Sequence, residues 1–326
     1  MRAIVIRTPG GPENLELREL PTPAVPAGHV RVRVRFAGVN RADLLQRRGL
    51  YPPPPGAPRD TPGLEYAGVI DAIGDGVTLF ETGDRVFGLV GGGAYAEYVV
   101  VHEREAVRVP SALPDDAAGA VPEAFVTAYD ALIVRGRLQP GERVLVHAAG
   151  SGVGTAGVQI GKALGCRVFG TSRTADKLER CAALGLDVSI VPHDGEFADA
   201  ILDATKGEGV DVVLELVGGH YVAEDLRALS NRGRIVVVGL TAGASADVNL
   251  GLLLRKRAEM IGTALRSRPL EEKIEAATML RKNIVPWLEA GVVRPLVDRV
   301  FPLGKAAQAH AYLESDASFG KVLLAL

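Results

Sequence analysis

Two patterns of hydrophobic and polar positions divide the chain. Up to about residue 120, apolar and polar residues alternate in short runs, as in 30–36, where valine and arginine take turns. This period of two is typical of half-buried strands. Similar runs occupy 1–7, 66–70, 84–87 and 96–101, and proline and glycine separate them, most densely in 51–56. The pattern predicts a β-rich, barrel-like domain.

From about residue 122 the pattern changes to strands alternating with helices. Strand-like runs occupy 144–146, 167–171, 188–191, 210–217 and 234–239, and helical patterns follow at 158–164 and 175–184. Such repeats predict a parallel sheet with helices on both faces. Ligands bind beyond the carboxyl ends of such strands, here near Ser151, Thr171, Gly218 and Leu240. The tail adds a helical stretch at 270–288 and strands at 297–300 and 320–324.

A glycine motif joins the first strand of this second part to its helix. Gly152-Val153-Gly154-Thr-Ala-Gly157 matches the dinucleotide-binding fingerprint, and it stands in the strand–turn–helix context that the fingerprint requires. Gly152 permits the tight turn, and Gly154 lets the backbone approach a pyrophosphate. The helix N-terminus then offers free N–H groups to the phosphates. A glycine-rich turn without a ligand is the alternative.

The end of the second strand indicates which nicotinamide cofactor is used. NAD-binding proteins place an acidic residue about 20 positions after the glycines. Here Ser172 and Arg173 occupy that strand end, with Lys177 one helical turn further on. These side chains suit a 2′-phosphate, which arginine can bind with two hydrogen bonds. We therefore predict NADPH, unless Arg173 and Lys177 are only solvated residues at a helix start.

Composition excludes several classes of protein. The 326 residues carry a net charge of -2, with no basic stripe for nucleic acid and no apolar run long enough to span a membrane. The N-terminal segment is too short and too charged for a signal peptide. The two cysteines, Cys166 and Cys181, form no Cys-x-x-Cys pattern, so a disulfide framework or cysteine-built zinc site is not expected. We expect a cytoplasmic protein without nucleic-acid or membrane partners.

Collinear short motifs give the chain a family resemblance over nearly its whole length. They are Gly10–Leu15, Asn40–Leu44, Tyr51–Ala57, Gly63–Glu65, Gly91–Gly93, Pro122–Ala124, Ser151–Thr155, Leu265–Arg268 and Gly320–Lys321. The chain resembles the zinc-free quinone oxidoreductase branch of the medium-chain dehydrogenase/reductase family. The resemblance implies an α/β fold: a GroES-like β-rich catalytic domain (1–121), a doubly wound parallel-sheet (Rossmann) NADP-binding domain (122–262), and a return to the catalytic domain (263–326).

The resemblance also bears on metal binding. Zinc-dependent relatives place a cysteine where this chain has Asn40 and a histidine where it has Leu64. Tetrahedral zinc needs three or four nitrogen, sulfur or oxygen ligands at defined spacing, and the scattered histidines do not supply them. We read all six histidines as structural and expect no bound metal.

By resemblance, Tyr51 and Ser151 lie close to the nicotinamide and the electron acceptor, and Asn40 lines the same cleft. A quinone is reactive enough to need only hydrogen-bond donors, so these three are the candidate catalytic residues. Each has a structural alternative: Tyr51 could pack over the proline loop, Ser151 could serve the helix N-terminus, and Asn40 could stabilise a turn. The resemblance adds Thr127, Leu240, Leu265 and Lys321 as cofactor-binding residues.

These observations predict an NADPH-dependent quinone reductase that forms a homodimer through the edges of its dinucleotide-domain sheets. The sequence favours neither one-electron nor two-electron reduction. One alternative is an NADPH-dependent reductase of enoyl thioesters or alkenals, which would need a proton donor for the α-carbon. Another is a non-catalytic, NADPH-responsive binding protein.

Overall fold

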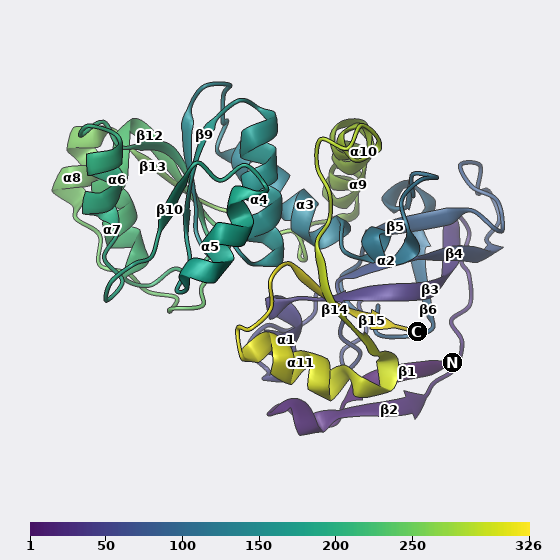
Figure 1. The fold of residues 1–326 in the computed structure, drawn as a ribbon. Coiled ribbons are helices and arrows are strands. Elements are labelled where there is room, and N and C mark those ends of the chain that lie inside the picture. The colour runs from purple at the N-terminus through teal and green to yellow at the C-terminus, as the bar shows by residue number, and fades with distance from the viewer. The chain divides into compact units, whose positions relative to one another are not determined.

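The computed structural model describes residues 1–326 and divides them into two compact units. The first unit combines Met1–Val126 with Leu265–Leu326, and the second is Thr127–Ala264. The chain crosses from the first to the second inside helix α3 (Pro122–Tyr129). Figure 1 shows the fold, with most helices and strands of both units labelled.

A seven-stranded sheet dominates the first unit, in the order β14-β15-β3-β4-β5-β7, with β6 also paired to β3. β1 and β2 form a separate antiparallel pair. The strands are β1 Arg2–Ile6, β2 Leu15–Glu19, β3 His29–Val39, β4 Glu65–Ile73, β5 Arg85–Leu89, β6 Tyr98–His102, β7 Val107–Arg108, β14 Val297–Pro302 and β15 Lys321–Ala325. Because β15 pairs with β3, the tail completes the sheet begun near the N-terminus.

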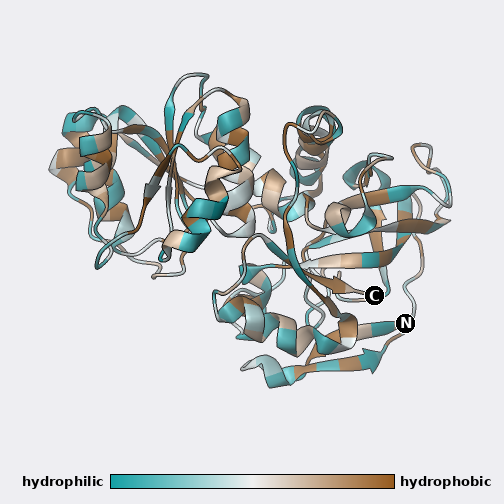
Figure 2. Ribbon diagram, in the orientation of Figure 1, coloured by the Kyte–Doolittle hydropathy of each residue, from teal (hydrophilic) through white to brown (hydrophobic).

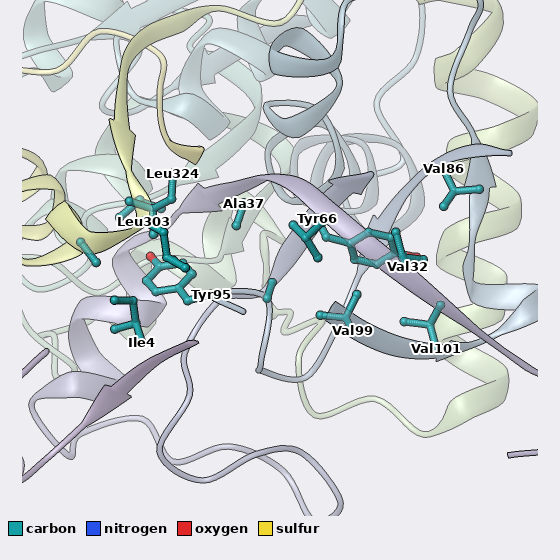
Figure 3. Packing of buried hydrophobic residues seen from close by; sticks show 14 of the residues in the cluster. Ile4, Val32, Ala37, Tyr66, Val86, Tyr95, Val99, Val101, Leu303 and Leu324 are labelled. Atoms are coloured by element: carbon teal, nitrogen blue, oxygen red, sulfur yellow. The ribbon is translucent and has the colours of Figure 1, made fainter. Parts of the chain in front are cut away.

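The predicted alternation along residues 30–36 forms the middle of β3. Val30, Val32 and Val34 are almost fully buried, whereas the intervening arginines are partly or fully exposed. Figure 3 shows Val32 in the core of this unit with residues from distant parts of the chain, among them Tyr66, Tyr95 and Leu324. The period of two is therefore explained by burial of one face of the strand.

Short helices surround this sheet: α1 Arg41–Arg47, α2 Asp115–Gly119, α9 Leu270–Met279, α10 Val285–Glu289 and α11 Ala306–Glu314. The helix predicted at 270–288 is present, but a π-helical turn, Leu280–Ile284, separates α9 from α10. Pro286, in the first turn of α10, lacks a backbone N–H and cannot continue a regular α-helix through this point.

Six parallel strands form the sheet of the second unit, in the order β10-β9-β8-β11-β12-β13. They are β8 Arg143–Val146, β9 Arg167–Thr171, β10 Val188–Ile190, β11 Val210–Glu215, β12 Leu229–Val237 and β13 Glu259–Gly262. Its helices are α4 Gly152–Ala163, α5 Ala175–Ala182, α6 Ala198–Ala204, α7 Tyr221–Ala228 and α8 Leu250–Lys256, besides a π-helical turn at Asp130–Arg135. The strand order reverses between β8 and β11, which is the ligand-binding position of doubly wound sheets.

Helices cover both faces of this parallel sheet, with α4 and α5 on one face and α6, α7 and α8 on the other (Figure 1). Val212, Val213 and Leu214 of β11 are fully buried, as a strand covered on both faces requires. The strands of this sheet are correspondingly apolar in Figure 2. None of the helices in the chain combines the length and apolar character needed to cross a membrane.

Candidate active site

The glycine turn of the second unit leads from β8 into helix α4. Ser151 is the N-cap, and its Oγ accepts the N–H of Gly154 at 3.0 Å. A Cβ atom on Gly154 would lie 2.2 Å from the carbonyl oxygen of Ala148, so only glycine fits there. The N–H groups of Gly152 and Val153 have no acceptor within the protein. They are available for phosphate oxygens, as the fingerprint predicts.

Ser172, Arg173 and Lys177 follow the carboxyl end of β9. Ser172 is largely buried, Arg173 is exposed, and Lys177 lies in the first turn of α5. A carboxylate is also close by: Asp176 begins the same helix, and a hydrogen bond with Thr174 lowers the pKa of Asp176. The strand end itself carries the polar and basic side chains from which a 2′-phosphate site can be built.

Two further predicted residues follow the ends of β11 and β12. Gly218 is buried with a φ of 71°, and a Cβ atom there would lie 3.0 Å from Leu240 Cδ2. Leu240 itself is 52% exposed. Glu215 Oε1 accepts the N–H groups of Val217 and Gly218, which fixes the turn after β11.

A buried polar cluster lies in the interior of the second unit. His147 Nε2 is 2.7 Å from Asp225 Oδ1, and its Nδ1 is 2.7 Å from Thr171 Oγ1. Glu215 Oε2 and Asp225 Oδ2 are buried without a hydrogen-bond partner. Burial raises the pKa of both carboxyl groups and lowers the pKa of His147.

The same cluster contains side chains that could bind a metal ion. One ligand atom each of His147, Glu215 and Asp225 lie within 4.8 Å of one another. The His147–Asp225 hydrogen bond already engages the imidazole and one carboxylate oxygen. One proton shared by Glu215 and Asp225 would satisfy their remaining oxygens. The arrangement therefore fits the structural role expected for His147.

In the first unit, the half-buried Asn40 and the buried Glu65 and Lys321 form a hydrogen-bonded group. Lys321 Nζ lies 2.6 Å from Glu65 Oε1 and 2.5 Å from Asn40 Oδ1. Asn40 Nδ2 donates to the same Glu65 oxygen at 2.9 Å. Asn40 also caps α1, because its N–H donates to Asp43 Oδ2 at 2.8 Å. The turn-stabilising role considered for Asn40 is thus present, together with contacts to two charged side chains.

Asp43 ties this group to the rest of the first unit. Its oxygens accept the N–H of Gly63 at 3.0 Å and the hydroxyl of Tyr95 at 3.2 Å. Burial raises the pKa of Asp43 to about 6, although the hydrogen bonds from backbone N–H groups oppose the shift. The carboxyl group is wholly buried and fully used by its partners, which fits a structural role.

Tyr51 is held by Arg266. The Arg266 guanidinium carbon lies 5.1 Å from the centre of the Tyr51 ring, and Nη1 donates to the Tyr51 carbonyl at 3.1 Å. Other guanidinium nitrogens donate to Gly91 O and Gln46 Oε1. Burial raises the pKa of the Tyr51 phenol, and the charge of Arg266 opposes that shift.

A pocket of the first unit adjoins these residues. Its lining includes Leu64, Val90, Glu123, Val126, Leu265 and Arg266. Leu64, at the position where zinc-dependent relatives carry a histidine, is apolar and 2% exposed, so it offers no ligand atom. Glu123 and Arg266 were not among the predicted site residues. Both lie in motifs that carried the family resemblance, and their surroundings depend on contacts with residues far along the chain.

The predicted residues are distributed over both units. Asn40, Tyr51, Leu265 and Lys321 belong to the first. The second contains Thr127, Ser151, Gly152, Val153, Gly154, Ser172, Arg173, Lys177, Gly218 and Leu240. Thr127 is 7% exposed in α3. The roles of these residues toward cofactor and acceptor stay predictions.

Comparisons with known proteins match both units. Residues 26–111 match the alcohol dehydrogenase GroES-like domain, and residues 152–281 match the zinc-binding dehydrogenase domain. The chain is 35% identical to a quinone oxidoreductase of Rattus norvegicus over 330 residues, covering 100% of this chain and 98% of that protein.

Solved structures agree with this assignment. Escherichia coli quinone oxidoreductase in complex with NADPH matches with a TM-score of 0.89 at 32% identity, covering 100% of both chains. The CurK enoyl reductase matches with a TM-score of 0.85 at 27% identity, covering 99% of this chain and 98% of that one. The predicted combination of a GroES-like domain and a Rossmann NADP-binding domain is confirmed. The chain is an oxidoreductase of the medium-chain dehydrogenase/reductase family and belongs with its quinone oxidoreductases.

Proposed function

We propose that this oxidoreductase reduces quinones with NADPH and works without a metal, as a homodimer. The observation that carries the proposal is the make-up of the first unit's polar group. Asn40 and Lys321 are hydrogen-bonded to Glu65 in that group, and Leu64 cannot ligate zinc. Tyr51, which lies beside Arg266, adds a phenol O–H as a donor. A quinone accepts a hydride readily, so donors aimed at its oxygens can stabilise the developing charge without a Lewis acid. The quinone oxidoreductases among the relatives support the same acceptor class.

The nicotinamide ring supplies the hydride when the cofactor is bound. Gly152 and Val153 offer N–H groups to the pyrophosphate, and Ser172, Arg173 and Lys177 bind the 2′-phosphate. Ser151 and Tyr51 orient the reacting groups and donate hydrogen bonds to them. Thr127, Gly218, Leu240, Leu265 and Lys321 complete the cofactor contacts that we propose.

Replacing Arg173 by alanine tests the choice of cofactor. Because a charge-assisted contact to the 2′-phosphate is lost, the KM for NADPH should rise about 10- to 100-fold, as a loss of roughly 1.5–3 kcal/mol implies. The KM for NADH should stay the same. The matched control is Arg180→Ala, which removes an exposed arginine further along α5. Equal losses with both cofactors, or equal efficiency of the native protein with both, would contradict the proposal.

One assay of NADPH oxidation against ortho-quinones, para-quinones and enals tests the acceptor. We expect turnover with quinones. The enoyl reductase among the structural relatives makes reduction of α,β-unsaturated carbonyls the second candidate, and activity confined to enals would establish it instead. Tight NADPH binding without any turnover would favour a binding protein. Elemental analysis completes the test, since stoichiometric zinc in the active protein would refute the metal-free mechanism.

A further inference from the structure

Glu123 lines the pocket of the first unit, and its carboxyl group has no hydrogen bond or ion pair. Its backbone N–H donates to Glu65 Oε2 at 2.8 Å. Arg266 lines the same pocket. Only 6% of Arg266 is exposed, yet its guanidinium bonds to two carbonyl oxygens and one amide oxygen and forms no ion pair. A carboxyl group and a guanidinium cation, neither of them in an ion pair, therefore belong to residues of one pocket, Glu123 and Arg266.

The balance of charges around Glu123 explains this arrangement. Two cations, Lys321 and Arg266, face three carboxyl groups, those of Glu123, Glu65 and Asp43. Lys321 is paired with Glu65 at 2.6 Å, and Asp43 accepts hydrogen bonds from backbone N–H groups. Glu123 is the third carboxyl group and lacks such partners. The other titratable residues nearby are Tyr51 and, along the pocket lining, Glu105, Arg268 and Lys273.

Burial, together with the neighbouring Glu65 and Asp43, raises the pKa of Glu123 to about 8, while Lys321 and Arg266 oppose the shift. Glu123 is therefore protonated in neutral solution. A group with a pKa near the working pH is the most effective general acid. The carboxylate left after proton loss would lie in the same pocket as the Arg266 guanidinium, whose positive charge favours it.

We propose that Glu123 is the proton donor of the reaction and contacts the oxygen of the acceptor that becomes a hydroxyl group. This inference rests on the proposed function. A quinone that has taken up a hydride, and with it two electrons, is a hydroquinone monoanion. The O–H bond of Glu123 breaks, a new O–H bond forms on that anion, and neutral hydroquinone leaves. The Glu123 carboxylate, beside Arg266, then takes a proton from water.

The test compares E123Q with the native protein, with Glu271→Gln, an exposed residue of α9, as the matched control. The native kcat should be level below pH 8 and should fall about tenfold per pH unit above it. E123Q should lose about 10²-fold in kcat, with a level profile to pH 9 and an unchanged KM for NADPH. E123D should recover part of the loss, because it restores an acidic proton.

A second measurement needs neither cofactor nor acceptor. In protein labelled with ¹³C at the glutamate carboxyl carbon, one NMR signal should titrate near pH 8 and be missing from E123Q. If E123Q keeps the native kcat and pH profile, Glu123 is not the donor. A signal titrating below pH 6 would equally exclude Glu123, even if E123Q does not fold and only the native protein and E123D can be measured. If the native protein reduces no quinone while this signal titrates as expected, the proposed function fails and the protonated state of Glu123 stands.

Discussion

At the scale of single residues, buried charge is the main chemical feature of this protein. Each unit contains acidic side chains removed from water: Asp43 and Glu65 in the first, Glu215 and Asp225 in the second. Burying a carboxylate is costly unless hydrogen bonds or a cation stabilise it. Lys321 provides the cation for Glu65. For Glu215 and Asp225 the partner is the neutral His147 ring, so these two acids together retain a proton that the unfolded chain releases.

The pH dependence of stability should reveal this retained proton. Between about pH 6.5 and 8 the folded second unit holds one proton between Glu215 and Asp225, so its free energy of unfolding should fall as the pH rises, on the order of 1 kcal/mol per pH unit. His147 acts in the opposite direction only below pH 6.5, because burial lowers the pKa of the ring. Glu215→Gln should flatten the fall and make the variant more stable than the native protein at pH 8.

Urea unfolding at pH 5, 6, 7 and 8 measures the effect, with Glu208→Gln as a control at an exposed glutamate. If the free energies of unfolding of the native protein and of Glu215→Gln change in parallel with pH, Glu215 is ionised in the folded state.

At the scale of elements, the turn between β8 and α4 depends on backbone space rather than on side chains. The Gly154 Cα faces the carbonyl of Ala148 at a distance that leaves no room for a methyl group. Gly154→Ala must therefore displace the start of α4, where the free N–H groups of Gly152 and Val153 point to the predicted phosphate site. We expect at least a tenfold loss of NADPH affinity and a lower melting temperature.

Gly304→Ala is the matched control, because the nearest atom to a Cβ atom there, Leu17 Cδ2, lies 3.7 Å away, an ordinary contact distance. Calorimetric titration of NADPH measures both variants. An unchanged affinity of Gly154→Ala for NADPH would show that the turn does not bind the phosphates of the cofactor.

Helices and strands could be predicted where the local pattern of apolar and polar residues determines them. The range predicted for β9, 167–171, matches the structure, since a short apolar run ends there in Gly170 and Thr171. The break between α9 and α10 was not predicted, because the hydrophobic period continues through a π-helical turn. Among the site residues, the glycine turn could be predicted because it acts through its backbone, and the spacing of the glycines indicates that backbone conformation. Arg266 and Glu123 were missed because their partners, Tyr51 and Glu65, are distant in sequence.

At the scale of the whole molecule, the sheet of the second unit ends in an unpaired strand. β13 bonds only to β12, and Met260 on β13 is 39% exposed. Leu250 and Leu254 of the neighbouring α8 are 71% and 76% exposed. An open apolar edge of this kind favours pairing with another strand. The proposed homodimer would place β13 of a second copy here.

Met260→Asp should weaken that dimer, because an aspartate at a paired edge would have to lose its hydration. We expect a shift from dimer to monomer in light scattering after size-exclusion chromatography. Leu17→Asp, at an exposed leucine on β2, serves as the control and should leave the mass unchanged. A monomeric native protein, or a Met260→Asp variant that stays dimeric, would rule out this edge as the interface.

The pairing of β15 with β3 has a consequence for synthesis on the ribosome. The second unit is one continuous segment, so all of its strands have been made before the tail that completes the sheet of the first unit. Until Lys321 arrives, Glu65 has no cation beside it, so the nascent first unit is held in a less stable state. A chain released early, without β15, would lack one strand of the first unit's sheet and the cation that balances the charge of Glu65.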